Sequence, residues 1–280
     1  MKCAWKQFLD LLPPTMRPKV DRLGRENLQE LRLRIGCQPL LVCANENRWL
    51  TETVNRETLS YVVNMACRYS PWTAESASMG YVTAPGGHRI GLCGQMAEKE
   101  GQSGSFTSLR SLNIRVARDF PGIASALAPL SGNVLLLGPP GSGKTTLLRD
   151  LIRQRAKMEC VGVADERGEL LPEGLEPSIG ADVLTGCRKP EAIAMLLRTM
   201  GPDVIAVDEI TQQQDCTALI QASWCGVRVL ATAHAHDAQD LQARQVYKPI
   251  VTSGVFDWLV VLKRDKTYRV ERMVRSLCGS

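Results

Sequence analysis

The sequence predicts an α/β protein in which a domain with a mostly parallel sheet follows a smaller α+β domain. Three observations predict this organisation. After residue 118 the chain alternates short apolar runs with helical segments, as chains with parallel strands and connecting helices do. Before residue 118 the strand-like segments alternate apolar and polar residues, as half-buried strands do. Pro121 and Gly122 interrupt both patterns, so we expect domains over residues 1–118 and 119–280.

The N-terminal domain is expected to combine helices with half-buried strands. Apolar residues at helical spacing begin at Trp5 and stop before Pro13-Pro14, a pair that cannot continue a helix. Leu31 to Ile35 alternates apolar and basic residues with the period of two that a strand requires. In chain order the predicted elements are a helix from Trp5 to Leu12, a strand from Leu31 to Ile35, a helix from Arg56 to Arg68, a hairpin from Gly80 to Gly94 that turns at Pro85-Gly86-Gly87, and a strand from Leu112 to Val116.

The C-terminal domain is expected to contain strands buried on both faces, because its apolar runs are continuous rather than alternating. The first run, Asn133 to Leu137, leads into a glycine-rich turn and a helix that ends at about Lys157. The later predicted elements are a strand over Val161–Ala164, a helix over Pro190–Met200, a strand over Asp203–Val207, a helix over Gln213–Cys225, a strand over Val227–Thr232, and two strands within Phe256–Val270 around a turn at Arg264-Asp265-Lys266.

The bulk composition argues against several classes of protein. Its 34 basic and 29 acidic residues are mixed along the chain and give a net charge of +5, which permits an acidic partner without requiring one. Aromatic residues make up 5% of the chain, which is few for stacking on bases, so the composition argues against nucleic acid as a partner. Ten cysteines form no CxxC pair and only three histidines are present, so we expect free thiols in a reducing cytoplasm rather than zinc.

The chain carries no sequence signal for membrane insertion. Its first ten residues have a charge every few positions and lack the apolar core of a signal peptide. No stretch approaches the roughly 18 uninterrupted apolar residues of a membrane span. We therefore expect a cytoplasmic protein without direct membrane insertion, which reaches a membrane only through partners.

The strongest motif lies between the first predicted strand of the C-terminal domain and its helix. Glycines there let consecutive backbone N–H groups point into one concavity, and the helix N-terminus and a lysine add positive charge for the phosphates of ATP. Lys144 is expected to bind the β- and γ-phosphates, and Thr145 to place its hydroxyl on Mg²⁺. The competing interpretation is a glycine-rich turn with an incidental lysine. The expected cradle consists of Gly138, Pro139, Pro140, Gly141, Ser142, Gly143, Lys144, Thr145 and Thr146.

The apolar segment that begins at Val204 ends in two adjacent carboxylates, Asp208 and Glu209, as a buried strand with acids at its end. Buried strands seldom end in paired acids without a functional reason. Asp208 is the predicted ligand of the Mg²⁺ shell, and Glu209 is the predicted base that activates water. The alternative is that one of them caps the next helix.

Polar residues also follow two other predicted strands. Glu166 comes directly after Val161–Ala164 and Asp165, and is expected to assist the attacking water if its strand lies beside the Asp208 strand. A surface loop of mixed charge is the competing interpretation. His234 follows the strand Val227–Thr232 and is a candidate sensor of the γ-phosphate, although isolated histidines are more often structural.

The chain resembles the stage III sporulation protein AA family of endospore-forming bacteria, itself similar to the hexameric ATPases of type II and type IV secretion and pilus systems. The resemblance covers nearly the whole chain and depends most on its N-terminal blocks. Those blocks stand here as Glu30 to Ile35, Tyr81-Val-Thr with Gly87 to Gly94, and Ser111 to Arg118; the later ones are Gly138 to Asp150, Asp165-Glu-Arg167, Asp182-Val-Leu with Gly186-Cys187, and Met200 to Ile210.

The resemblance implies a RecA-like P-loop ATPase domain that assembles as a ring, a homo-oligomer expected to be a hexamer. It also implies docking on membrane subunits of a channel between mother cell and forespore. In secretion ATPases an acidic box occurs where Asp165, Glu166 and Glu169 stand and a His box where His234 stands, and arginines of the N-terminal domain reach the nucleotide. Arg89, Arg115 and Arg118 lie in the matching blocks, and pairing with Asp or Glu on a strand face is the alternative for each.

The chain departs from its relatives at a few positions. Secretion ATPases usually have Gly where Asp208 stands, and the tetracysteine module of some type II relatives is absent. Family members commonly read Cys-Pro-Lys where this chain has Cys187-Arg188-Lys189, which puts the partner surface near those residues in doubt.

Three functions compete at this point. The first is a Mg²⁺-dependent ATPase that drives a secretion-like channel in endospore formation. The second is a nucleic-acid-stimulated ATPase, which the basic strand from Leu31 to Ile35 allows and the scarcity of aromatics opposes. The third is a nucleotide-dependent assembly switch without turnover, which the presence of Glu209 disfavours.

Overall fold

A computed structural model describes residues 1–43, 45–67, 80–97, 106–171 and 180–273. These residues form two compact units, one ending at Asp119 and the other beginning at Phe120. Each unit has its own sheet and its own apolar core. Of the sequence predictions, the C-terminal end of the helix at Arg68 lies outside the described residues, as does Cys278.

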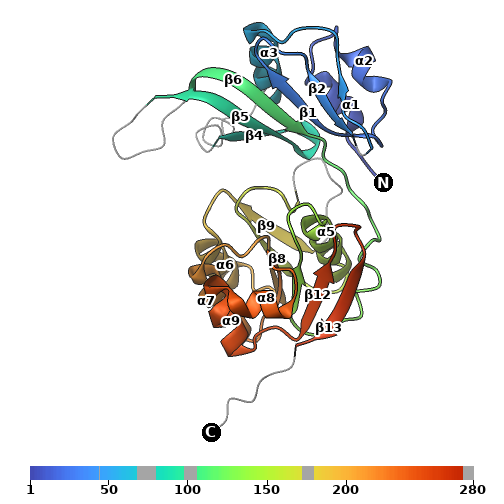
Figure 1. The fold of residues 1–280 in the computed structure, drawn as a ribbon. Coiled ribbons are helices and arrows are strands. Elements are labelled where there is room, and N and C mark those ends of the chain that lie inside the picture. Colours follow the sequence, from blue (N-terminus) through green and yellow to red (C-terminus); the bar gives the residue numbers. More distant parts are fainter. Residues whose placement is uncertain (44, 68–79, 98–105, 172–179, 274–280) are drawn as a thin grey trace. The chain divides into compact units, whose positions relative to one another are not determined.

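The N-terminal unit is a six-stranded antiparallel sheet in the order β3-β2-β1-β6-β5-β4. Figure 1 shows it in blue and green, with α1, α2 and α3 beside the sheet. Its elements are α1 (Trp5–Asp10), α2 (Arg17–Asp21), β1 (Leu28–Arg34), β2 (Leu40–Cys43), β3 (Arg48–Trp49), α3 (Arg56–Ala66), β4 (Tyr81–Ala84), the 3₁₀ turn η1 (Pro85–Gly87), β5 (His88–Met96) and β6 (Phe106–Arg115).

Apolar and polar residues alternate along the strands, which explains why the helices pack on one face of this sheet. Leu31 and Leu33 on β1 are fully buried, whereas Arg32 and Arg34 between and after them point away from the core. Phe8 of α1 and Leu59 of α3 join the same buried cluster. Burying such side chains stabilises the unit by about 1.5–3 kcal/mol for each residue.

His88 ties three segments of the N-terminal unit together. The ring is fully buried, and its Nε2 lies 3.0 Å from the carbonyl oxygen of Ala4, while the backbone N–H of Ala117 donates to Nδ1 at 3.0 Å. A neutral imidazole protonated on Nε2 satisfies both contacts. Burial lowers the pKa of His88, and the hydrogen bond to Ala4 acts against that shift.

We predict an acid-sensitive contribution of His88 to stability. The folded state holds the ring neutral, whereas the unfolded chain takes up a proton below its pKa of about 6.5. Stability from this group is therefore complete above about pH 6.5 and is lost as the pH falls. Thermal unfolding should show that His88→Gln lowers the free energy of unfolding by about 1–3 kcal/mol at neutral pH. Between neutral pH and pH 5, the variant should lose less stability than the wild type does. Parallel pH profiles of the two proteins would contradict this.

The C-terminal unit is a seven-stranded sheet in the order β13-β12-β7-β11-β10-β8-β9, parallel except for the edge strand β13. Its strands are β7 (Val134–Leu137), β8 (Val161–Asp165), β9 (Ala181–Thr185), β10 (Val204–Val207), β11 (Arg228–Ala233), β12 (Trp258–Leu262) and β13 (Tyr268–Arg272). Its helices are α5 (Lys144–Arg155), α6 (Lys189–Thr199), α7 (Gln213–Trp224), α8 (Ala238–Ala243), the 3₁₀ turn η2 (Gln245–Tyr247) and α9 (Lys248–Ser253).

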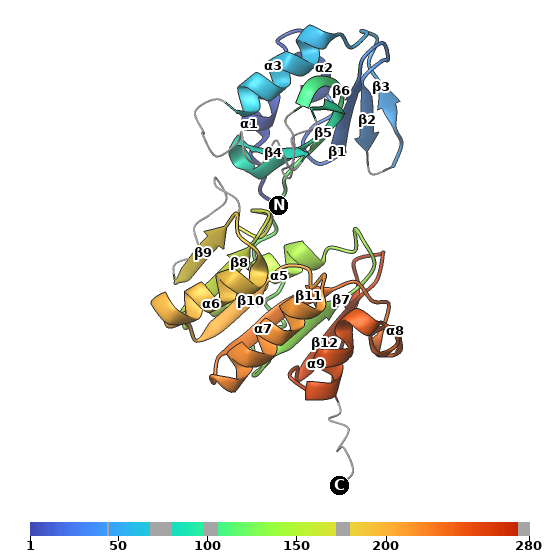
Figure 2. The same ribbon diagram turned by 90° about the vertical axis from the view of Figure 1, so that its left-hand side faces the viewer.

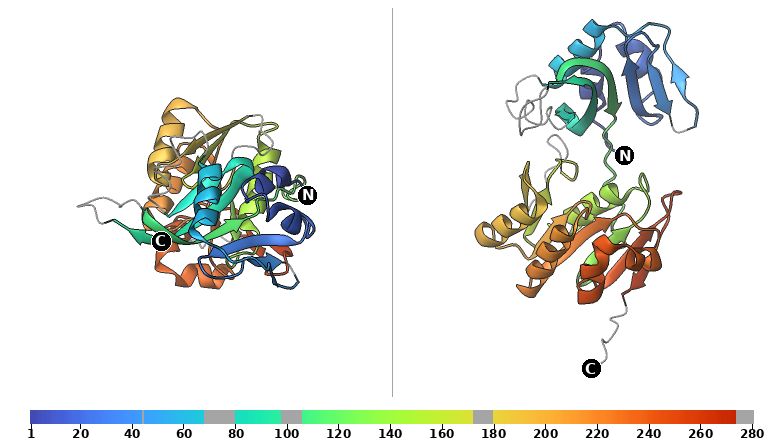
Figure 3. Two further views of the ribbon diagram at one scale, coloured as in Figure 1. Left: turned by 90° about the horizontal axis from the view of Figure 1, so that it is seen from above. Right: turned by 60° about the vertical axis from the view of Figure 1, so that its left-hand side comes forward.

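Helices cover both faces of this sheet. Figure 2 shows α6, α7 and α9 side by side over one face, where Ile193 and Leu219 pack on inward residues of β10 and β11. On the other face, Leu148 and Ile152 of α5 pack on β7 and β8. The right-hand view of Figure 3 shows the red hairpin of β12 and β13 at one edge of the sheet and yellow β9 at the other.

The strand order decides which loop segments lie next to one another at the carboxyl edge of this sheet. β11 is inserted between β7 and β10, and β8 lies on the far side of β10. Because parallel strands end at the same edge, the segments that follow β7, β11, β10 and β8 lie next to one another in that order. The segments after these four strands carry all the active-site residues predicted in the C-terminal domain.

The α/β fold with a parallel sheet after a smaller α+β unit confirms the predicted fold class. The hairpin turning at residues 85–87 is present as β4, η1 and β5, and the predicted strand at Leu112–Val116 begins earlier, at Phe106. Strands β2, β3 and β9 were not predicted. They are short and partly exposed, so their residues lack a long apolar pattern. Within the described ranges, no helix combines the length and the apolar character that crossing a membrane requires.

Candidate active site

The glycine-rich segment after β7 forms a tight loop that leads into α5. Gly141 and Gly143 have φ values of 74° and 99°, which side chains with a Cβ rarely adopt. At Gly138 the neighbours leave no room, because an added Cβ would lie 2.6 Å from the hydroxyl of Ser142 and 2.9 Å from the carbonyl of Leu262. Glycine is therefore required by backbone conformation at two positions and by close packing at the third.

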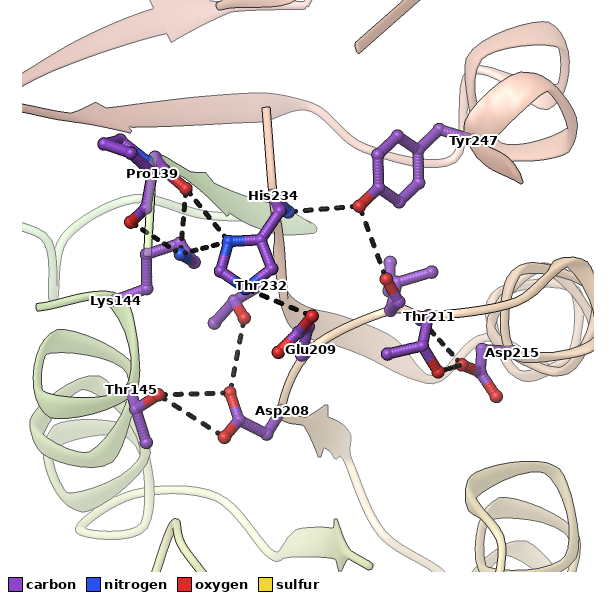
Figure 4. A network of polar contacts seen from close by, with 12 residues as sticks. Pro139, Lys144, Thr145, Asp208, Glu209, Thr211, Asp215, Thr232, His234 and Tyr247 are labelled. Atoms are coloured by element: carbon purple, nitrogen blue, oxygen red, sulfur yellow. Dashed lines mark hydrogen bonds and ion pairs between the residues drawn. The ribbon is translucent and has the colours of Figure 1, made fainter. Parts of the chain in front are cut away.

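Lys144 is buried at the start of α5 and makes three contacts (Figure 4). Its Nζ donates to the carbonyl oxygens of Gly138 at 2.8 Å and Pro139 at 3.1 Å, and lies 2.9 Å from Nδ1 of His234. An ammonium group is only a donor, so Nδ1 of His234 accepts and Nε2 carries the proton. Burial lowers the pKa of Lys144, and the charges of Glu209 and Asp208 oppose that shift.

His234 connects the lysine to the predicted base. Its Nε2 lies 3.1 Å from Oε1 of Glu209, so one imidazole joins the loop after β7 to the loop after β10. The side chains of His234 and Glu209 remain about one third exposed, at 30% and 37%. A ligand from solvent can therefore reach both. The structure places Lys144, His234 and Glu209 in one chain of polar contacts.

Asp208 faces the start of α5. Both of its carboxylate oxygens lie 3.4 Å from the hydroxyl of Thr145, and the Thr232 hydroxyl lies 3.3 Å from Oδ1. Burial raises the pKa of Asp208, and hydrogen bonds from the backbone of Glu209 and the Thr232 hydroxyl act against it. The two residues predicted to share a metal, Thr145 and Asp208, thus lie side by side (Figure 4).

The two adjacent acids at the end of β8 differ in their surroundings, because Asp165 is buried and Glu166 is only partly buried. Asp165 is buried and accepts from the backbone N–H groups of Glu169 and Leu170, both at 2.8 Å, which shapes the following loop. Burial raises the pKa of Asp165 to about 6. Glu166 instead pairs with Lys189 at the start of α6, at 2.8 Å. The strand order does place Glu166 beside the Glu209 loop, and its part in activating water stays a prediction.

The candidate arginines belong to the N-terminal unit. The guanidinium of Arg89 lies 4.3 Å from the ring centre of Tyr81, and Arg115 pairs with Glu30 at 3.2 Å. Arg118 donates to the carbonyl of Leu28 at 2.6 Å. Arg115 therefore has the carboxylate partner that the alternative interpretation named, and contact of any of the three with a nucleotide stays a prediction.

Three residues at the site were not found by sequence reasoning. Thr232 contacts Asp208, and buried Lys189 joins Glu166 to the buried carboxylate of Asp215 at 3.6 Å. The hydroxyl of Tyr247 accepts from the N–H of His234 at 3.1 Å and lies 3.4 Å from the carbonyl oxygen of Ile210. Only Lys189 left a signal in the sequence, because lysine at the start of a helix opposes the helix dipole.

Comparison with solved structures identifies the fold. The crystal structure of the pilus retraction motor PilT with bound ADP has a TM-score of 0.62 at 15% sequence identity, over 92% of this chain and 83% of that one. The Legionella pneumophila ATPase DotB has a TM-score of 0.60 at 16% identity, over 93% of this chain and 80% of that one. At these identities the likeness shows the fold alone, and it confirms the predicted RecA-like architecture.

Sequence comparison identifies the family. The Type IV pilus assembly ATPase TfpB of Acinetobacter baylyi is 32% identical over 52% of this chain, which spans 24% of that protein. Stage III sporulation protein AA of Bacillus subtilis (strain 168) is 33% identical over 93% of this chain and 91% of that protein. The family model for sporulation stage III, protein AA matches residues 6–274. The chain therefore belongs to the stage III sporulation protein AA family.

Proposed function

We propose that this protein binds ATP with Mg²⁺ at the loop from Gly138 to Thr146 and hydrolyses it. The observation that carries the proposal is the meeting of Lys144, Asp208 and Glu209 at one sheet edge, although 64 and 65 residues separate the lysine from the two acids (208 − 144 and 209 − 144). A phosphate-binding loop beside two carboxylates is the arrangement that phosphoryl transfer to water requires.

Each side chain has a defined task in this reaction. The backbone N–H groups of the loop and the ammonium of Lys144 bind the phosphates and offset the negative charge that develops on them. Glu209 accepts a proton from the attacking water. The Nε2–H of His234 donates a hydrogen bond to Glu209, which orients the carboxylate, and Nδ1 lies close enough to Lys144 to respond when the lysine engages phosphate.

The residues around Asp208 fit a magnesium ion. Mg²⁺ prefers oxygen ligands, and Thr145 and Asp208 present a hydroxyl and a carboxylate next to each other. Burial disfavours the charged form of Asp208, and a divalent cation held beside it would favour that form. Mg²⁺ bound there would neutralise charge on the phosphates.

We predict that turnover requires Mg²⁺ through Thr145. Phosphate release from ATP should stop when the ion is chelated, and Thr145→Ala should raise the Mg²⁺ concentration for half-maximal rate by about tenfold or more. Thr217→Ala is the matched control, since it removes a threonine hydroxyl that bonds the carbonyl of Gln213 on α7. Unchanged Mg²⁺ dependence in Thr145→Ala would remove this residue from the metal site.

The proposed biological role is that of a motor for a secretion-like channel in endospore formation. Family membership supports the sporulation role, and similarity to a type IV pilus assembly ATPase and the fold of a pilus retraction motor support the motor role. We propose that the protein acts in the mother cell as a ring, expected to be a hexamer, docked on membrane subunits.

The ring can be tested by mass. Native mass spectrometry or light scattering should show a higher oligomer when a non-hydrolysable ATP analogue and Mg²⁺ are present. A monomer with and without the analogue would count against a ring motor while leaving ATP hydrolysis open to the assay above.

A further inference from the structure

We infer that Lys266, in the turn between β12 and β13, is a second lysine of the phosphate-binding site. This inference rests on the proposed ATPase function and adds a residue that lies 122 positions after Lys144 (266 − 144). Lys266 Nζ donates to the carbonyl oxygen of Gly141, at the middle of the glycine-rich loop. A Cβ placed on Gly143 would lie 3.7 Å from Cδ of Lys266, so the lysine stem runs along the same loop.

The backbone at Lys266 is held in an unfavourable conformation. Its φ of 70° is the one positive value among the non-glycine residues that the structure describes. This left-handed region costs a residue with a Cβ about 1 kcal/mol, and glycine or asparagine is the usual choice there. Replacing the lysine by glycine would relieve that cost, so a lysine at this position calls for a reason other than stability.

The turn around Lys266 is well defined by hydrogen bonds. Lys263 N donates to Thr267 O at 2.9 Å, Lys266 N donates to Lys263 O at 3.2 Å, and Asp265 accepts from both the N–H and the hydroxyl of Thr267. β12 pairs with β7, whose end begins the glycine-rich loop. The strand order therefore places the turn between β12 and β13 beside the glycine-rich loop, and the side chain of Lys266 points toward that loop.

The ammonium of Lys266 has donors to spare for a ligand. A lysine carries three N–H donors, and in the described residues Gly141 O is the acceptor that the structure gives it. Its side chain is exposed, so a ligand from solvent can reach the ammonium group. A cation at this distance from the loop adds to the attraction of Lys144 for a polyphosphate.

Substitution of Lys266 separates charge from backbone strain. Lys266→Gly removes both, Lys266→Gln removes the charge but keeps a donor for Gly141 O, and Lys266→Arg keeps the charge. We expect Kd for ATP, measured by calorimetry with Mg²⁺, to rise about five- to tenfold in the Gly and Gln variants and to stay near wild type in the Arg variant. The melting temperature of Lys266→Gly should equal or exceed that of the wild type. Lys263→Gln, which removes a charge from the same turn, should leave Kd unchanged.

The outcomes are distinguishable. Wild-type affinity in both the Gly and Gln variants would overturn the inference while leaving the proposed function intact. If Lys266→Gly loses affinity for ATP and Lys266→Gln retains it, the inference is also overturned, because Lys266 would then act only through its hydrogen bond to Gly141. Absence of ATP binding in the wild type would instead overturn the proposed function itself.

Discussion

Replacing Lys144 with alanine is expected to lower the rate of ATP hydrolysis by about a hundredfold or more, because Lys144 is the buried lysine at the start of α5 that we propose binds the phosphates. The side chain is buried and donates to two loop carbonyls and to His234, so its loss removes charge and also releases the loop. ATP affinity should fall together with the rate. Phosphate release and calorimetric titration measure the two quantities.

The matched control for this variant is Lys157→Ala. Lys157 is exposed beyond the end of α5, and its Nζ donates to the side-chain oxygen of Gln154 at 2.7 Å. The Lys157→Ala variant removes one positive charge from the same part of the chain and leaves the glycine-rich loop unchanged. Hydrolysis by Lys144→Ala at the wild-type rate, with a melting temperature near that of the control, would exclude the proposed active site.

Replacing Glu209 with glutamine is expected to lower the maximal rate by about 10²- to 10⁴-fold while ATP binding is retained, because the amide cannot accept the proton of the attacking water. The amide oxygen can still accept from Nε2 of His234, so the contact at 3.1 Å can persist. This variant therefore separates chemistry from binding, whereas Lys144→Ala affects both.

Glu191→Gln serves as the control for Glu209→Gln. Glu191 is exposed on α6 and pairs weakly with Arg188 at 3.7 Å, so its neutralisation should leave hydrolysis unchanged. If Glu209→Gln retains the wild-type rate, Glu209 is not the base. Glu166 then becomes the next residue to test, since it lies on the neighbouring loop after β8.

Much of the candidate site could be predicted because its motifs are short and local. The loop from Gly138 to Thr146 requires a particular backbone conformation within nine residues, and glycines at 141 and 143 mark it in the sequence. Likewise, a continuous apolar run followed by Asp208 and Glu209 predicts a buried strand with acids at its exit. Glu166 and His234 were also placed at strand ends, by the same logic.

Other site residues could not be predicted because their contacts depend on strand order. Nothing near Thr232, Tyr247 or Lys266 in the chain marks the first as a neighbour of Asp208, the second as a neighbour of His234, or the third as a neighbour of the glycine-rich loop. They come into contact only when β11 is inserted between β7 and β10, and β12 pairs with β7 on the other side.

By itself the sequence determined the fold class, most helices and strands, and the positions of the glycine-rich loop and of the two acids, because periodicity and turn chemistry act within a few residues. Only the tertiary structure decided which residues contact one another. His234 lies between Lys144 and Glu209, Lys189 pairs with Glu166, and Lys266 donates to the carbonyl oxygen of Gly141. Such pairs depend on packing between segments up to 125 residues apart, as for Lys266 and Gly141, and no local pattern contains that information.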